Sequence, residues 1–179
     1  DISNKTIGII GLGRIGRLLV KFLGPFNCKI LVNDIKPDND FIKKNNLFFC
    51  NKYQIYKKAD IISLHIPLTP KTYNMIQLKQ LQIMKNNCVL INTSRGGIIN
   101  EKDLYAHLKC NSEFYAAVDV FQNEPYTGKL CYLNNIILTP HLGSCSEQSR
   151  YLMELGAVQN IIDFYNGANL KLNSNFIIP

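Results

Sequence analysis

A glycine-rich turn near the N-terminus constrains the fold of this chain more than any other feature. Residues 11–16 read GLGRIG and follow Thr6–Ile10, a short, β-branched and nearly uncharged run. Such a run is typical of a parallel strand that is buried on both faces. An amphipathic stretch comes next, so we expect a helix that starts near Arg14 and is stopped by Gly24-Pro25. The apolar face of this helix would consist of Ile15, Leu18, Leu19 and Phe22.

The three glycines of this turn suit the binding of a dinucleotide. Gly11 permits the tight turn, Gly13 lets backbone approach a pyrophosphate, and Gly16 lets the helix pack on the strand. The N–H groups and the dipole at the start of the helix favour a phosphate. A second strand, 28–33, then leads to Asp34 at roughly the 20-residue offset of an acid that binds the adenosine ribose. Asp34 favours NAD over NADP, and the alternative is an ordinary surface acid after a strand.

Length and composition favour one folded domain with a sizeable core. The chain has 179 residues, of which 46% are hydrophobic and 18% charged. It contains no apolar run of about 18 residues or more and no signal-peptide pattern, so neither a membrane span nor secretion is indicated. The six cysteines lack C-x-x-C and metal-ligand spacing, which favours reduced thiols in a cytoplasmic protein and no metal site.

The net charge of +7 raises the possibility of nucleic-acid binding. The lysines occur in separated pairs, such as those at 43–44 and 57–58, and form no basic tract. Solvated helix faces explain such pairs, so we expect no nucleic-acid partner; the alternative is a basic nucleic-acid-binding domain.

Strands alternate with helical stretches along the rest of the chain. Alternation of this kind predicts an α/β fold, a doubly wound parallel sheet (Rossmann-type) of about six or seven strands. A last helix, from Ser144 to about Asn166, would carry an apolar stripe and stop at Gly167. The later strands are expected at 47–50, 61–66, 88–92, 114–120 and 135–139.

Polar residues gather where these predicted strands end, and ligands bind at the carboxyl ends of parallel strands. Arg95 stands beside two glycines at such an end, and its planar fork suits a substrate carboxylate; the alternative is a surface salt bridge. Asp119 and His141 follow later strands, whereas His107 lies within a helix and is interpreted as structural or solvated.

Five motifs in order carry a resemblance to a known family. The chain resembles the nucleotide-binding domain of the D-isomer-specific 2-hydroxyacid dehydrogenases over nearly its whole length. The segment EPYTGKLCYLNNIILTPHLGS is also similar to members related to 3-phosphoglycerate dehydrogenase. The motifs are GIIGLGRIGR, SLHIPLTPKTYNMI, LINTSRGGIINEKDL, DVFQNEP and LTPHLGS.

The resemblance implies an NAD-dependent transfer of hydride to or from a 2-hydroxy/2-oxo acid. Its catalytic residues would be Arg95, Glu124 and His141. His141 would exchange the hydroxyl proton, Glu124 would orient the imidazole, and Arg95 would hold the substrate carboxylate. Taken singly, His141 could be a loop histidine and Glu124 an exposed acid.

The resemblance also implies a set of cofactor contacts. Arg14 and Ile15 would meet the pyrophosphate, while His65 and Pro67 would line the adenosine side. His65 could instead be a packing residue at a strand end. Asp119 would reach the nicotinamide carboxamide. The remaining contacts would come from Thr93, Ser94, Arg95, His141 and Gly143.

Members of the family place this domain inside a second, substrate-binding domain. We expect that domain to be absent from residues 1–179, with the helix and tail of 144–179 returning toward it, so that the chain alone is poorly active. The full-length protein would be a homodimer. An alternative within the same fold family is an NAD-sensing, corepressor-like interaction module.

Overall fold

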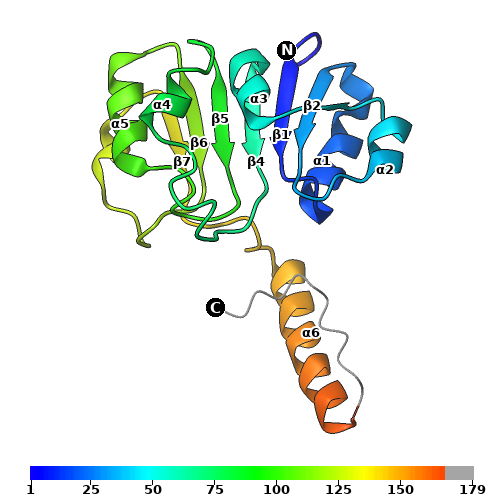
Figure 1. Ribbon diagram of the computed structural model, residues 1–179. Helices are drawn as coiled ribbons and strands as arrows, with labels where there is room; N and C mark the ends of the chain where they lie inside the picture. Colours follow the sequence, from blue (N-terminus) through cyan, green and yellow to red (C-terminus); the bar gives the residue numbers. More distant parts are fainter. Residues whose placement is uncertain (168–179) are drawn as a thin grey trace. The chain divides into compact units, whose positions relative to one another are not determined.

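The computed structural model describes residues 1–167 (Figure 1). The chain divides into two compact units, Asp1–His141 and Leu142–Pro179. The first unit contains every strand and the predicted site, apart from Gly143. Among the described residues, no helix has the length and apolar character that a membrane span requires.

The first unit is built on a seven-stranded sheet with the order β3-β2-β1-β4-β5-β6-β7. All neighbouring strands are parallel, which confirms the predicted doubly wound sheet. The order reverses between β1 and β4, and such a switch point is where open α/β sheets bind ligands. The strands are β1 (Thr6–Ile10), β2 (Lys29–Asn33), β3 (Phe48–Phe49), β4 (Ile61–Leu64), β5 (Val89–Asn92), β6 (Tyr115–Val118) and β7 (Ile136–Leu138).

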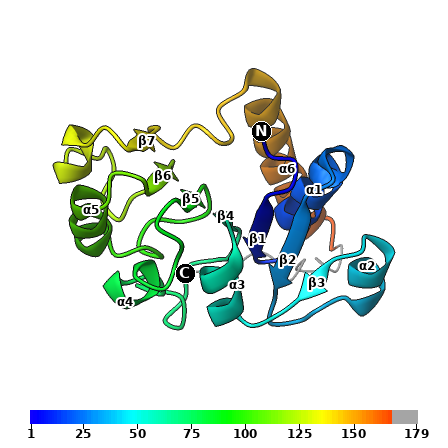
Figure 2. The same cartoon turned by 90° about the horizontal axis from the view of Figure 1, so that it is seen from above.

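Helices cover both faces of the sheet, as the view from above shows (Figure 2). One face carries α1 (Arg14–Leu23) and α2 (Asn39–Lys44), and the other carries α3 (Lys52–Lys58), α4 (Leu78–Leu81) and α5 (Glu101–Cys110). Two 3₁₀ turns, η1 (Gly24–Phe26) and η2 (Lys129–Tyr132), complete the unit.

The alternation of side chains along β1 creates two hydrophobic cores. Ile7 and Ile9 pack with α1 and α2, whereas Ile10 packs with the helices of the opposite face. A Cβ at Gly8 would collide with Ile55, so glycine lets α3 approach the strand closely. Both faces of the central strand are therefore buried, as its uncharged sequence predicts.

The structure buries a different face of α1 from the predicted one. The helix turns Gly16, Val20 and Leu23 toward the sheet. Gly16 sets this rotation, because a Cβ there would collide with the carbonyl oxygen of Gly11 and only glycine permits the contact. Residues four and seven positions further along then face the sheet as well. The predicted face stays largely exposed, at 66% for Ile15, 47% for Leu18 and 63% for Phe22.

Gly24-Pro25 does not stop the helical path. Gly24 keeps helical angles and the chain continues as η1, since proline is tolerated in the first turn of a helical segment. The path ends at Asn27, whose φ of 50° is left-handed.

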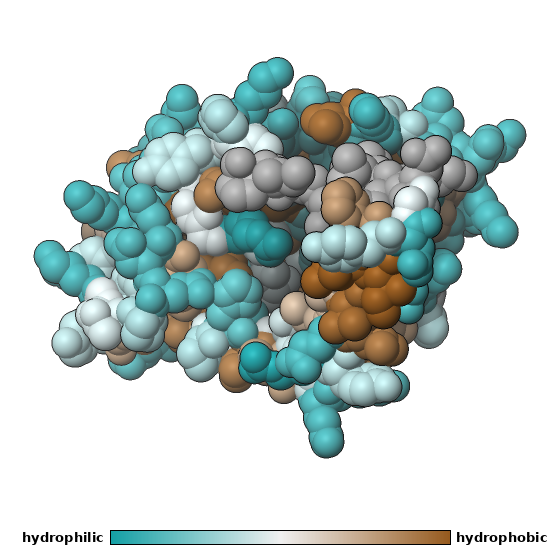
Figure 3. Space-filling view, turned by 90° about the horizontal axis from the view of Figure 1, so that it is seen from below, coloured by the Kyte–Doolittle hydropathy of each residue, from teal (hydrophilic) through white to brown (hydrophobic). Residues whose placement is uncertain are grey.

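The second unit contains α6 (Glu147–Tyr165), which Ser146 caps by accepting a hydrogen bond from the Ser149 N–H. The helix starts three residues beyond the predicted Ser144, and Gly167 follows it with a φ of 69°, as expected of a helix stop. None of its residues is buried. Exposed apolar residues appear brown in Figure 3. The predicted tail 173–179 lies outside the described residues.

Candidate active site

The glycine turn has the shape that an approaching phosphate requires. Gly11 has a φ of 100°, and a Cβ there would collide with the carbonyl group of His65. Gly13 faces open space, with nothing within 4 Å of the position of a Cβ. Gly11 and Gly16 therefore allow the tight packing of the turn, while the backbone at Gly13 stays accessible.

The N-terminus of α1 is free to meet an anion. Gly13 is the N-cap residue and provides no side-chain cap, and the first turn contains no acid. The first N–H groups of a helix lack partners within the helix and attract negative charge. Arg14 and Ile15 are exposed at this end, as expected of residues beside a bound pyrophosphate. This geometry fits a dinucleotide.

Asp34 is part of the same turn. Its Oδ2 accepts a hydrogen bond from the Leu12 N–H at 2.6 Å, and its Oδ1 accepts one from the Lys36 N–H at 2.8 Å. The carboxylate thus connects the end of β2 to the glycine turn, and its role in binding the ribose stays a prediction. Each oxygen retains a second lone pair for a ribose hydroxyl.

A buried amide at the end of β5 fixes the turn that contains Arg95. Asn92 is 1% exposed, and its Nδ2 donates to the Arg95 carbonyl at 3.0 Å. Its Oδ1 accepts from the Ser94 N–H at 3.1 Å and from the Ser94 hydroxyl at 2.8 Å. Sequence analysis overlooked Asn92, although an amide as the last residue of a buried strand, two positions before a serine, is a signal for such a turn.

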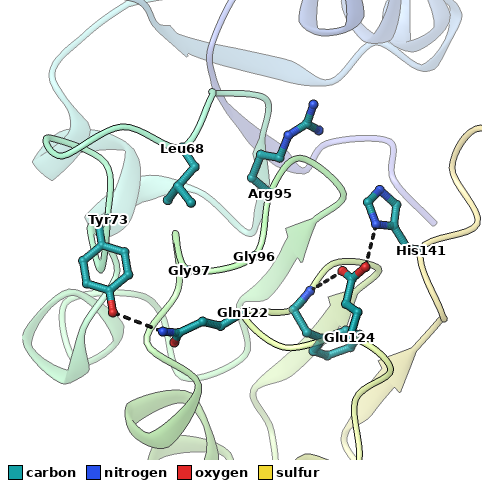
Figure 4. Close-up of a pocket in the computed structure, with 9 residues that line it drawn as sticks. Leu68, Tyr73, Arg95, Gly96, Gly97, Gln122, Glu124 and His141 are labelled. Atoms are coloured by element: carbon teal, nitrogen blue, oxygen red, sulfur yellow. Dashed lines mark hydrogen bonds and ion pairs between the residues drawn. The ribbon is translucent and has the colours of Figure 1, made fainter. Parts of the chain in front are cut away.

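Glu124 and His141 form a pair across the ends of β6 and β7 (Figure 4). The Nδ1 of His141 lies 2.9 Å from Oε2 of Glu124, and Oε1 of Glu124 accepts the Phe121 N–H at 2.9 Å. His141 has a left-handed φ of 56°, and its N–H donates to the Thr139 carbonyl at 3.0 Å. Backbone in this sparsely populated region is typical of functional positions.

The surroundings of Glu124 determine which imidazole nitrogen carries the proton. The Phe121 N–H, followed by the hydrogen bond with His141, holds the pKa of Glu124 below its ordinary value of 4.5. The carboxylate is therefore ionised near neutral pH and can only accept hydrogen bonds. Nδ1 of His141 must then be the donor, which leaves Nε2 as the nitrogen that can exchange a proton with a ligand.

The three predicted catalytic residues line one hollow of about 340 Å³. Arg95, Glu124 and His141 come from loops that follow three different strands, and the structure brings them together (Figure 4). Gln122 donates through Nε2 to the Tyr73 hydroxyl at 3.3 Å across the same hollow. Sequence analysis singled out no residue among the other lining positions, which are Leu68, Tyr73, Gly96, Gly97, Phe121 and Gln122.

A second hollow, of about 410 Å³, contains other predicted cofactor residues. His65, Ile15 and Thr93 line it together with exposed apolar side chains of α1. The Nε2 of His65 lies 2.9 Å from the Ser63 hydroxyl, and burial lowers the pKa of this imidazole. His65 therefore has a hydrogen-bond partner within the chain, and its contact with the cofactor stays a prediction.

The remaining predicted residues differ in their surroundings. Asp119 is 5% exposed, and its Oδ1 accepts the Thr139 hydroxyl at 2.5 Å. Pro67 lies three residues beyond the end of β4 at Leu64, and its carbonyl accepts the Thr72 hydroxyl at 2.7 Å. Gly143 belongs to the second unit. His107 packs edge-on against the Phe114 ring at 4.6 Å, a structural contact. Within residues 1–167 no group of three His, Cys, Asp or Glu side chains could hold a metal ion.

The parallel sheet, the glycine turn at α1 and the acid after β2 define a Rossmann-type dinucleotide-binding domain with an arginine, a glutamate and a histidine at its strand ends. The family model described as "D-isomer specific 2-hydroxyacid dehydrogenase, NAD binding domain" matches residues 1–143. This chain belongs to that family, so the resemblance and the choice of NAD are confirmed.

Similar proteins of known identity share the fold. The chain is 37% identical over 169 residues to a glyoxylate reductase of Korarchaeum cryptofilum, covering 93% of this chain and 51% of that protein. It is 39% identical over 152 residues to a D-3-phosphoglycerate dehydrogenase of Methanocaldococcus jannaschii, covering 84% of this chain and 29% of that protein. A solved structure of D-lactate dehydrogenase from Aquifex aeolicus with NAD and lactic acid superposes with a TM-score of 0.88 at 26% identity. The match covers 100% of this chain and 59% of that protein. The chain spans about half the length of the curated relatives it matches.

Proposed function

We propose that this chain is the NAD-binding and catalytic part of an oxidoreductase that transfers a hydride between NAD(H) and a 2-hydroxy/2-oxo acid. The observation that carries the proposal is the His141–Glu124 pair, with 2.9 Å between Nδ1 and Oε2, in the hollow that Arg95 also lines. A general acid, its orienting carboxylate and a carboxylate-binding guanidinium are the groups that reduction of a 2-oxo acid requires.

Arg95 binds the substrate carboxylate in this proposal. Its guanidinium offers two parallel N–H donors, which match the two oxygens of a carboxylate. Asn92 holds the backbone of its turn, so the guanidinium starts from a fixed position. Gly96 lets the segment after Arg95 pack directly against the Phe121 carbonyl, since a side chain there would collide with it.

His141 supplies the proton. When bound, NADH supplies the hydride that adds to the carbonyl carbon. Nε2 of His141 gives its proton to the carbonyl oxygen, which completes the hydroxyl group, and takes it back in the oxidation direction. Glu124 stabilises the protonated imidazole by accepting the Nδ1–H bond, since it remains ionised near neutral pH.

The glycine turn and Asp34 hold the cofactor. The backbone at Gly13 and the N-terminus of α1 receive the pyrophosphate, with Arg14 and Ile15 beside it. Asp34 accepts hydrogen bonds from the adenosine ribose and repels a 2′-phosphate. Asp119 and the turn at Thr93 and Ser94 face the nicotinamide half. The remaining proposed contacts are Gly11, Gly16, His65, Pro67, Arg95, His141 and Gly143.

The substrate is a 2-hydroxy/2-oxo acid, and two classes are to be compared. One is an oxo acid such as glyoxylate, which is reduced, and the other is the 2-hydroxy acid 3-phosphoglycerate, which is oxidised. Relatives named for each match this chain at similar identity, 39% and 37%. Among the lining residues of the hollow, Arg95 is the permanently charged cation, which supports a substrate with one carboxylate. A cytoplasmic location and a homodimer stay predictions from the sequence.

Initial rates test this proposal. The protein encoded by the complete gene is assayed with NADH and NADPH against glyoxylate, hydroxypyruvate and pyruvate, and with NAD⁺ and NADP⁺ against 3-phosphoglycerate in the oxidation direction. We expect reduction of at least one 2-oxo acid with NADH, and a loss of about 10²–10³ in kcat/KM in Arg95→Ala, because the substrate loses its carboxylate partner. Unaltered kcat/KM in Arg95→Ala would exclude the assigned role.

A further inference from the structure

The helix that follows the Arg95 turn also contacts the loop that contains Glu124. Glu101 is the first residue of α5, and its Oε1 accepts a hydrogen bond from the Gln122 N–H at 2.8 Å. Gln122 precedes Glu124 by two positions in the 121–125 loop. A carboxylate that accepts a backbone N–H makes a charge-assisted bond, which is about twice as strong as a neutral one. The loop is therefore attached to α5 through one side chain.

The same peptide unit is also contacted from its other side. A Cβ at Gly96 would collide with the carbonyl group of Phe121, so the segment after Arg95 lies directly on this peptide. The Phe121 N–H in turn donates to Glu124 at 2.9 Å. The segment from Arg95 to Glu101 thus contacts the Phe121–Gln122 peptide, which directly follows the peptide whose N–H the Glu124 carboxylate accepts.

We propose that Glu101 is a positioning residue, whose carboxylate fixes the 121–125 loop and so holds Glu124 in place against His141. The inference rests on the proposed function for the roles of Glu124 and His141. Glu101 acts on Glu124 through the Gln122 N–H in this proposal. In this arrangement one side chain attaches the segment that follows Arg95 to the loop that contains Glu124.

A purely structural role for Glu101 makes a different prediction. An acid in the first turn of a helix stabilises the helix through its dipole. Asp103 has the same relation to α5, because it also lies in the first turn and its Oδ2 accepts a backbone N–H, that of Leu78, at 2.9 Å. Asp103 does not contact the 121–125 loop through this bond. Asp103→Ala is therefore the matched control for Glu101→Ala.

The pKa of Glu124 reports its position. The charged groups that face this carboxylate are His141, which lowers its pKa, and Asp119, which raises it. The largest effect is the hydrogen bond from the Phe121 N–H, which lowers it. A loosened loop weakens this bond and the pairing with His141, so the pKa of Glu124 rises. Loss of the Glu101 negative charge alone would act in the opposite direction. A rise in the pKa of Glu124 would therefore indicate a displaced carboxylate, whereas a fall would indicate only the loss of the Glu101 charge.

The experiment is a carbon-13 NMR titration of the Glu124 carboxyl group in the 179-residue chain. We expect the pKa of Glu124 to rise in Glu101→Ala and not to rise in Asp103→Ala. Glu101→Gln keeps an acceptor oxygen at the same reach and should not raise it. Glu101→Asp keeps the charge but withdraws the carboxylate by one methylene, so it should raise the pKa, and it replaces Glu101→Ala if that variant does not fold.

Two results would overturn the inference: an unchanged pKa of Glu124 in both Glu101→Ala and Glu101→Asp, or an equal rise in Asp103→Ala. In the protein from the complete gene, Glu101→Ala should lower kcat by about 10- to 100-fold with a smaller change in KM, the expected consequence of a misplaced catalytic pair. The titration needs no turnover. If reduction of 2-oxo acids proved independent of His141, the proposed function would fail. The NMR titration would still test whether Glu101 positions Glu124.

Discussion

The carboxylate of Asp34 lies 2.6 Å from the backbone nitrogen of Leu12, inside the glycine turn. The residue assigned to cofactor choice therefore also fixes the turn that receives the pyrophosphate. In the proposed function this side chain acts at both ends of the adenosine half of the cofactor, so we expect its replacement to be more damaging than the loss of one ribose contact.

Replacement of Asp34 should weaken cofactor binding. We expect Asp34→Ala to raise the Kd for NADH by about tenfold or more, because a charge-assisted bond contributes about 1.5–3 kcal/mol, and to narrow the preference over NADPH. Titration calorimetry of the 179-residue chain measures both affinities. Asp38→Ala is the control, because Asp38 pairs with Arg17 at 2.8 Å and caps α2 outside the glycine turn. If Asp34→Ala bound NADH and NADPH with the same affinities as wild type does, Asp34 would have no role in cofactor binding.

Two glycines of the turn should respond in opposite ways to alanine. A methyl group at Gly16 collides with the Gly11 carbonyl, so Gly16→Ala should lower the free energy of unfolding by roughly 1–3 kcal/mol. Gly13 has a φ of −75° and open space, so Gly13→Ala should keep its stability or gain about 0.4–1 kcal/mol. Gly13→Ala should nevertheless bind NADH more weakly, because the methyl group occupies the approach of the pyrophosphate. Urea unfolding and NADH titration of both variants check this contrast; reversed stabilities would contradict it.

The sequence predicts the positions of the strand ends better than the contacts made there. Arg95 and His141 follow short apolar runs, and the parallel arrangement of these strands brings both residues to one edge of the sheet. The predicted face of α1 was wrong because it followed the larger apolar residues, which occur on both sides of that helix, whereas the close approach at Gly16 decides between the two sides. The role of Asn92 depends on a local turn and was accessible from the sequence in principle. That of Glu101 depends on a partner 21 residues away, which no spacing rule identifies.

Acid should weaken the fold through Asp60. Its Oδ2 accepts the Thr6 N–H at 2.7 Å and its Oδ1 accepts Nζ of Lys85 at 2.7 Å. Burial raises the pKa of Asp60, but the hydrogen bonds from Lys85 and Thr6 and the charges of Lys85 and Lys5 outweigh it, so the net pKa lies below the ordinary 3.8. The stabilisation is therefore fully present above pH 3.8 and is lost as the pH falls through the lowered pKa of the folded state.

The stability difference between wild type and Asp60→Asn measures this contribution. We expect about 1 kcal/mol at neutral pH, modest because both partners are partly exposed, and a decrease toward zero in strong acid. Lys85→Met should remove part of the same stabilisation, so the two changes should not be additive. Chemical unfolding at a series of pH values gives these free energies. A difference that grows as the pH falls would contradict the assignment.

The central claim is that His141 exchanges the substrate proton, and its replacement tests this most directly. In the protein encoded by the complete gene, His141→Ala should lower kcat/KM for 2-oxo acid reduction by about 10²–10⁴ while the Kd for NADH stays close to that of wild type. His107→Gln, which changes a histidine packed against Phe114, should leave reduction unaltered. Reduction at the wild-type rate by His141→Ala would contradict the account.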